Sequence, residues 1–139
     1  METKNTNPIQ KLSVSILNTI FVGLLSIPFY FIYGSSNIYK LILVFIFFLY
    51  NFSFIFLTKN RCLGMIILNI QWKKEYPIKN QLIYVFLYSL SFSTIVIWIF
   101  FPFDLLLFNL LLIQLPCVLK TGTTLHGYLS GKMSGFKTT

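Results

Sequence analysis

Long uncharged runs are the feature that most constrains the fold of this chain. Three runs without a charged residue cover residues 12–33, 41–58 and 81–101, and a fourth apolar run opens on Asp104 and ends at residue 119. About 20 apolar residues in a helix cross the hydrocarbon core of a bilayer. The runs therefore predict an all-α membrane protein of about four transmembrane helices in two hairpins, forming a single membrane domain over residues 1–139.

The composition agrees with this prediction. Hydrophobic residues make up 56% of the chain and charged residues 10%, whereas about a quarter of a soluble protein is charged. An ordinary cytosolic enzyme is excluded, because too little polar surface exists to cover the apolar runs. The main polar parts are a loop over residues 59–80 and a tail over residues 120–139.

Turn and breaker residues set the expected span ends. Residues 34–37 form a short turn, Pro28 predicts a kink late in the first span, and Pro102 ends the third. Only two residues then separate the third and fourth spans, which predicts a tight antiparallel hairpin. Asp104 fits the first turn of the fourth helix, where a carboxylate meets the positive end of the helix dipole.

The basic residues indicate the orientation. The formal net charge is +8, and ten of the eleven Lys and Arg residues lie in segments 1–11, 59–80 and 120–139, leaving only Lys40 in the remaining loop region. Because Lys and Arg are enriched in cytoplasmic loops, both termini are expected in the cytoplasm, with the protein in the cell inner membrane. Nucleic-acid binding is not expected, since the aromatic residues lie inside the apolar runs.

The 59–80 loop admits two interpretations. Residues 66–72 could pair as a strand with residues 132–136, giving a small β patch on the cytoplasmic side. Equally, residues 63–72 could form an interfacial helix with Lys73 and Lys74 at lipid phosphates. Cys62 and Cys117 lie on the predicted cytoplasmic side, where thiols stay reduced, and their spacing does not indicate a metal site.

Two segments carry a family resemblance. Residues 58–72 (TKNRCLGMIILNIQW) and residues 124–133 (TLHGYLSGKM) resemble the cytoplasmic and closing motifs of RDD-family membrane proteins. The positions that match the family motifs are Lys11, Gly64, Met65, Thr124, Leu125, His126 and Gly131. At the positions where the family has Arg, Asp and Asp, this chain has Lys11, Asn18 and Gly127. Sodium/proton antiport is associated with the family, but coupled ion movement needs ionisable groups within the membrane, so the resemblance implies the fold more strongly than antiport.

Polar residues inside the spans are the candidate functional positions. They are Asn18, Asn51, Asn109 and Gln114, which could form a polar path, although interhelical hydrogen bonding is the favoured interpretation. Asn18 is expected to face the bundle interior because it matches a family Asp. His126, the only histidine, could sense pH between about 5 and 8, but a structural hydrogen-bonding role is favoured.

The sequence favours a non-enzymatic function. No catalytic, cofactor-binding or metal-ligating set is predicted, and broad apolar helix faces must be covered by lipid or by a partner. The leading prediction is a binding or assembly partner of another membrane component, with the bilayer and another membrane protein or a second copy as partners. The alternatives are an ion or small-solute transporter acting as an oligomer and an immunity-type protein against a membrane-active peptide.

Overall fold

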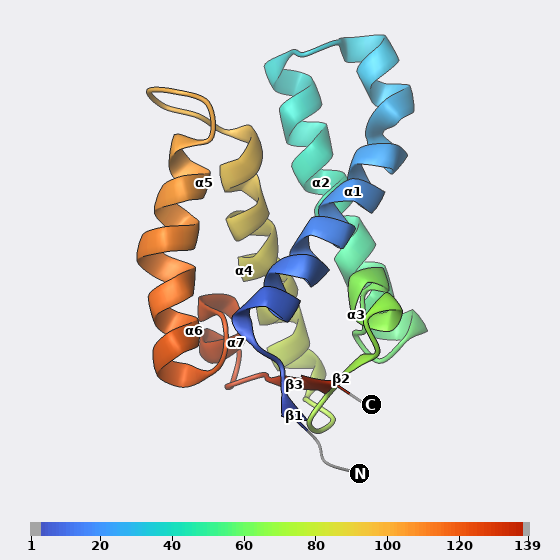
Figure 1. Ribbon diagram of the computed structural model, residues 1–139. Coiled ribbons are helices and arrows are strands. Elements are labelled where there is room, and N and C mark those ends of the chain that lie inside the picture. The colour runs from blue at the N-terminus through green and yellow to red at the C-terminus, as the bar shows by residue number, and fades with distance from the viewer. Residues whose placement is uncertain (1–3, 138–139) are drawn as a thin grey trace.

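Helices make up most of the computed structural model, which describes residues 4–137 (Figure 1). Residues 1–3 and 138–139, the ends of the predicted cytoplasmic segments, lie outside the described residues. The helices are α1 (Pro8–Tyr33), α2 (Asn37–Leu57), α3 (Leu63–Ile67), α4 (Ile78–Val96), α5 (Asp104–Phe108), the π-helical segment η1 (Asn109–Gln114), α6 (Leu115–Thr121) and α7 (Leu125–Leu129). The strands are β1 (Lys4–Asn5), β2 (Ile70–Trp72) and β3 (Gly135–Lys137).

Three helical segments are long and apolar enough to cross a membrane. They are Pro8–Tyr33, Asn37–Leu57 and the continuous helix Asp104–Thr121. The remaining predicted span, residues 81–101, corresponds to α4, which begins at Ile78 and is the least apolar of the long helices because it includes Lys79, Asn80 and several hydroxyl side chains. The fold is therefore mostly helical and compatible with a multi-pass membrane protein.

Side-chain caps explain where the first hairpin begins and turns. The Asn7 side chain accepts a hydrogen bond from the Gln10 N–H (2.8 Å), and the Gln10 side chain accepts one from the Asn7 N–H (3.1 Å). This capping box, with Pro8 at the first helical position, starts α1 four residues before the apolar run. The predicted turn at 34–37 is confirmed, since α1 ends at Tyr33 and Ser36 caps α2.

The second hairpin differs from the prediction. Helix α4 ends at Val96 rather than residue 101, so the link to α5 spans residues 97–103 and the predicted two-residue link is wrong. The Asp104 carboxylate accepts hydrogen bonds from the backbone N–H groups of Ile99 (3.0 Å) and Phe100 (2.7 Å). These bonds stabilise a loop instead of another helical turn. The predicted place of Asp104 in the first helical turn is confirmed.

A small antiparallel sheet joins the beginning, middle and end of the chain. Strand β3 lies between β1 and β2, with Phe136 opposite both Asn5 and Gln71. The strand interpretation of the 59–80 loop is right in part, because residues 70–72 pair with residues 135–137. A short helix, α3, precedes this strand, and its position at a membrane interface stays a prediction. A turn follows α7, with Gly131 at φ 101°, a left-handed conformation that glycine adopts readily.

The core lies between α1, α2, α3 and α4. Phe47 is 1% exposed and its ring stacks on Phe92 with centroids 3.9 Å apart, while Val22 is fully buried beside them. The α5–α6 helix packs on α4 and on the end of α1, and Figure 1 shows it on the side of α4 away from α2. Most of its apolar side chains remain exposed.

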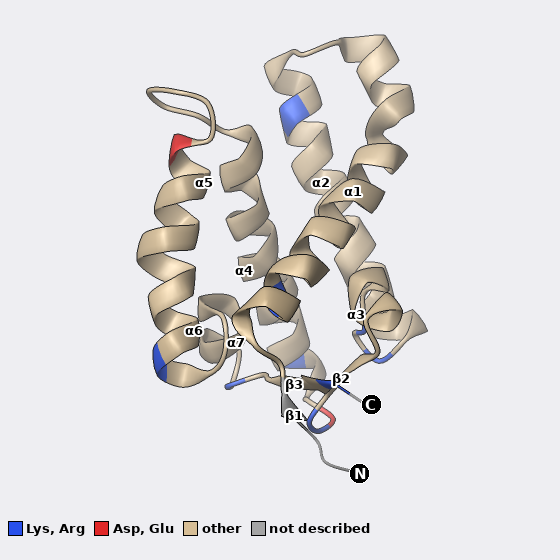
Figure 2. Cartoon of the chain, in the orientation of Figure 1, with Lys and Arg blue, Asp and Glu red and all other residues tan. Residues whose placement is uncertain are grey.

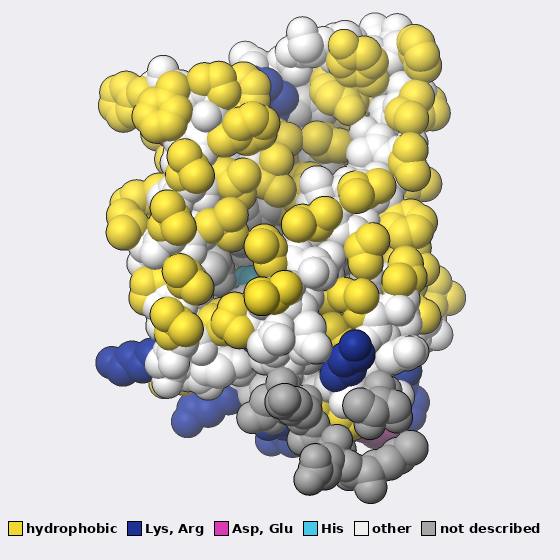
Figure 3. All heavy atoms as spheres, viewed as in Figure 1, with side chains coloured by type: hydrophobic (Ala, Val, Ile, Leu, Met, Phe, Trp, Pro, Cys, Tyr) yellow, Lys and Arg dark blue, Asp and Glu magenta, His cyan; other side chains and the backbone are white. Residues whose placement is uncertain are grey.

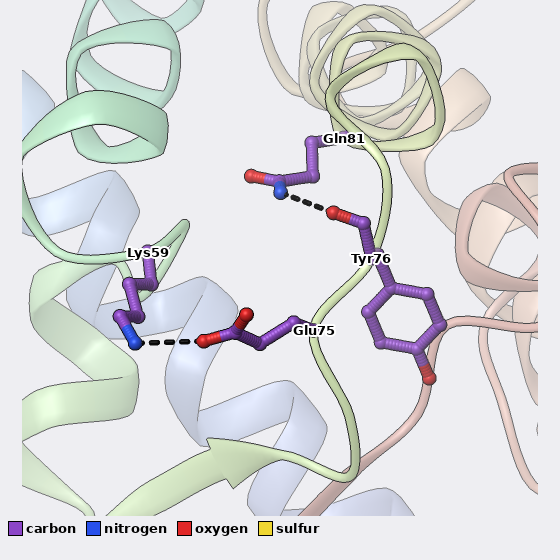
Figure 4. Close-up of polar contacts among 4 residues, drawn as sticks. All are labelled: Lys59, Glu75, Tyr76 and Gln81. Atoms are coloured by element: carbon purple, nitrogen blue, oxygen red, sulfur yellow. Dashed lines mark hydrogen bonds and ion pairs between the residues drawn. The ribbon is translucent and has the colours of Figure 1, made fainter.

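The loop between α2 and α4 is held by polar contacts. Lys59 and Glu75 form an exposed ion pair at 2.7 Å, and the Gln81 amide donates to the Tyr76 carbonyl at 2.7 Å (Figure 4). The Trp72 indole N–H donates to the Asn60 carbonyl at 2.8 Å. This last bond ties the end of β2 to the segment that follows α2.

Charge is segregated along the long axis of the bundle. Figure 2 shows most of the blue Lys and Arg segments at the end that carries the sheet, whereas the one basic residue of α2, Lys40, lies toward the opposite end. Lys40 Nζ lies 5.1 Å from the centre of the Trp98 ring there, a favourable cation–π contact.

Candidate functional site

Asn18 connects four elements at the centre of the fold. Its side chain is fully buried on α1. Its Oδ1 accepts hydrogen bonds from the Tyr50 hydroxyl (3.0 Å) and the Gly64 N–H (3.1 Å). Its Nδ2 donates to the Cys62 sulfur (3.1 Å) and the Tyr88 hydroxyl (3.3 Å). The expected interior position of Asn18 is confirmed.

These contacts use the full hydrogen-bonding capacity of the Asn18 amide, which has two N–H donors and two acceptor lone pairs. Such a group joins helices, because moving it would leave several buried polar atoms unpaired. The neighbouring Cys62 is a free, buried thiol. Burial raises the pKa of Cys62, and the hydrogen bond from Asn18 only partly offsets that effect. The thiol is therefore protonated at neutral pH.

The other three polar span residues form separate contacts. Asn51 donates to the Phe47 carbonyl of its own helix (2.9 Å). Asn109 donates to the Ser91 hydroxyl of α4 (2.7 Å) and accepts from Gln114 (3.2 Å), five residues along in the π-helical segment. The structure thus brings Asn109 and Gln114 together, but Asn18 and Asn51 belong elsewhere in the bundle. Hydrogen bonds between elements account for most of these side chains.

His126 is buried among aromatic rings. It is 6% exposed, its ring stacks on Tyr88 with centroids 4.8 Å apart, and it meets the Tyr84 ring edge-on at 4.9 Å. Its Nε2 is hydrogen-bonded to the Thr124 hydroxyl at 2.9 Å, whereas its Nδ1 is buried without a partner. Burial first, and then the charge of Lys11, lowers the pKa of His126 to about 3. The imidazole is therefore neutral at physiological pH.

Several family-motif positions line one small cavity of about 60 Å³. Its lining includes Lys11, Met65, Thr124 and His126. The Lys11 ammonium donates to the carbonyl (3.1 Å) and hydroxyl (2.5 Å) oxygens of Thr6 beside this cavity. The two motif segments and the start of α1, far apart in sequence, thus form one cluster. We call it the motif cavity.

The glycines of the two motif segments lie where neighbouring atoms leave no room for a side chain. Gly64 lies against α1, where a Cβ would come 2.7 Å from the Val14 carbonyl oxygen. At Gly127, a Cβ would come 2.9 Å from the Met133 carbonyl oxygen, and at Gly131 it would meet the Asn80 side chain. The Asp expected from the family at position 127 would therefore require a backbone shift. Leu125 begins α7, and its N–H donates to Gln114 (3.1 Å).

A groove opens beside the motif cavity. It has a volume of about 380 Å³ and lies between α1 and the η1–α6 segment, over α4. Its apolar lining residues include Ile9, Leu12, Leu110, Leu111, Leu115 and Val118, and its polar ones include Lys11, Ser15, Gln114, Thr124 and His126. Figure 3 shows this face, where yellow side chains surround a hollow with the cyan histidine visible inside it. We call this feature the lateral groove.

Sequence reasoning missed the aromatic partners of the polar residues. Tyr50 and Tyr88 each hydrogen-bond Asn18, and Ser15 bonds the Tyr88 hydroxyl at 3.0 Å. A signal was available, because a tyrosine deep inside an apolar run needs a partner for its hydroxyl group. The identity of that partner depends on how the helices pack.

Comparison with known proteins adds no assignment. No family model, no curated protein and no solved structure gives a significant match to the chain. The resemblance to the RDD family therefore stays a prediction from the two motifs. What the chain can bind must be argued from the lateral groove and the residues around it.

Proposed function

We propose that this chain is a non-enzymatic, four-span membrane protein that binds another membrane component and serves as its assembly partner. Both termini and the small sheet lie on the cytoplasmic side in this proposal. Three apolar helices and the gathering of basic residues at the sheet end (Figure 2) support it, because Lys and Arg favour the cytoplasmic side of a membrane.

The lateral groove is the observation that carries the proposal. Within the described residues, α1, α2, α3 and α4 share a well-packed core, whereas the α5–α6 helix leaves a gap toward α1. Leu111 and Leu115 line this gap and are 57% and 41% exposed. At bilayer depth such a concave apolar surface is filled by a component of the membrane, either lipid or a partner helix.

Transport is the alternative that the polar residues were expected to support. The Asn18 amide is fully engaged by protein groups, which favours a structural role over ion coordination. Binding in the lateral groove requires no movement of these residues. Binding in the groove is therefore compatible with the hydrogen bonds that these residues make.

Site-specific photo-crosslinking in membranes tests the proposal. A photoreactive residue at Leu111 lines the groove, while one at Leu112 is 65% exposed on the same helix but outside the groove lining. We expect Leu111 to give a discrete adduct that Leu112 does not give. Identical, diffuse lipid adducts at both positions would contradict the proposal, and a cation-dependent pH gradient in proteoliposomes of the purified chain would favour transport.

A further inference from the structure

A third space adjoins the motif cavity on the sheet side. It measures about 330 Å³ and is lined by Lys73, Thr121, Gly122, Thr123, Tyr128, Lys132, Ser134 and Gly135. It shares Thr123, Ser134 and Gly135 with the motif cavity, which in turn shares Lys11, Ser15 and His126 with the lateral groove. We call this space the basic pocket. The three spaces form a series from an apolar groove to a cationic end.

The two cations that line the basic pocket, Lys73 and Lys132, have no acidic partner among the described residues. Lys73 and Lys132 line the basic pocket and are exposed, and Lys73 is close enough to the half-buried Lys11 for their charges to repel. Of the described acids, Glu75 pairs with Lys59, and Asp104 binds backbone N–H groups at the start of α5. A bound anion would relieve the repulsion among these lysines.

An unpartnered polar atom belongs to a residue that lines both the groove and the motif cavity. His126 lines both spaces, is more than nine-tenths buried, and has no partner for its Nδ1. When Nε2 accepts from the Thr124 hydroxyl, Nδ1 carries the proton and can donate it in a hydrogen bond. A ligand carbonyl oxygen at this depth would satisfy it.

We propose that the component bound in the lateral groove is an anionic glycerophospholipid of the cytoplasmic leaflet. An acyl chain lies along Leu111 and Leu115, an ester carbonyl accepts from His126, and the phosphate group lies at Lys73 and Lys132. The site offers apolar side chains, then a hydrogen-bond donor, and then cations. Such a lipid carries its acyl chain, ester carbonyl and phosphate in the same order. Basic pockets beside transmembrane helices bind anionic headgroups in this way. This inference rests on the proposed function and names the chemistry of its ligand.

Native mass spectrometry of the purified protein in mild detergent tests the lipid proposal. Phosphatidylglycerol and phosphatidylcholine with identical acyl chains are added separately. We expect the anionic lipid to bind at least tenfold more tightly, with one molecule retained per chain. Inorganic phosphate at millimolar concentration should not displace it, whereas displacement would show a free-anion site and overturn the lipid proposal.

Two double variants locate the site. Lys73→Ala with Lys132→Ala removes the pocket cations, while Lys74→Ala with Lys120→Ala removes two exposed lysines outside the pocket lining. The first pair should lose most of the preference for anionic lipid, and the second should retain it. Equal effects of both pairs, or equal binding of both lipids by the unmodified protein, would overturn the proposal.

The experiments distinguish a failure of the lipid proposal from a failure of the proposed function. If the Leu111 crosslinker captures a membrane protein and no lipid preference is found, the lipid inference fails and the binding function stands. If Leu111 behaves like Leu112, both fail. Leu111→Trp, which narrows the groove, should reduce lipid retention several-fold, whereas Leu112→Trp should not.

Discussion

At the scale of single residues, the interior is organised by hydrogen bonds from neutral groups. Asn18, Tyr50 and Tyr88 satisfy one another and fix the relative positions of α1, α2 and α4. The match of Asn18 to an Asp of the RDD family predicted its interior position, where protein groups now hydrogen-bond it. It could not identify the two tyrosines, since that choice depends on the rotation of each helix about its axis.

We expect the stability of the protein to depend on pH through His126. Its pKa of about 3 in the folded protein lies below the value of about 6.5 in an unfolded chain, so the unfolded state binds more protons between these values. The contribution of the buried, neutral His126 to the free energy of unfolding is fully present above about pH 6.5 and is lost progressively as the pH drops. Between pH 7.5 and 5.0 we expect a loss of about 2 kcal/mol, measured by thermal unfolding in detergent.

The control for this prediction is His126→Gln, which keeps hydrogen-bonding capacity but does not titrate. The variant should unfold at nearly the same temperature at pH 7.5 and pH 5.0. The carboxylates titrate mainly below this range, so they contribute little. An unchanged pH dependence in the variant would show that another group is responsible.

At the scale of elements, hydropathy predicted the long helices but not all of their ends. The ends depend on particular bonds, such as the Asn7–Gln10 box that starts α1 and the Asp104 bonds that shape the 97–103 loop. Strand β1 has two residues and pairs with residues 136–137 at the other end of the chain. So short a strand has no periodicity, and only its distant partner defines it.

Two glycines provide a matched test of how α3 packs on α1. Gly64→Ala places a methyl group 2.7 Å from a backbone oxygen of α1, and the helices must separate. We expect a loss of about 1–3 kcal/mol in unfolding experiments. Gly23→Ala meets nothing within 4 Å and should stabilise α1 by about 0.5–1 kcal/mol. Equal effects of the two substitutions would contradict the packing seen here.

At the scale of the whole molecule, charge separation predicts the orientation in the membrane. In a Cys117→Ser background, Cys62 remains buried and protonated. A cysteine at the exposed Ser35 should react with a membrane-impermeant maleimide in intact cells, whereas Lys74→Cys should react only after permeabilisation. The opposite pattern would place the termini outside and would remove the leaflet assignment of the bound lipid.

The central position of β3 has a consequence for the order of folding. The strand that pairs with both β1 and β2 follows all the described helices in the chain. The sheet can therefore close only after residues 135–137 have been synthesised, when the helices that precede them are already made. A chain that stops at Ser134 retains every described helix yet lacks the strand that joins β1 to β2.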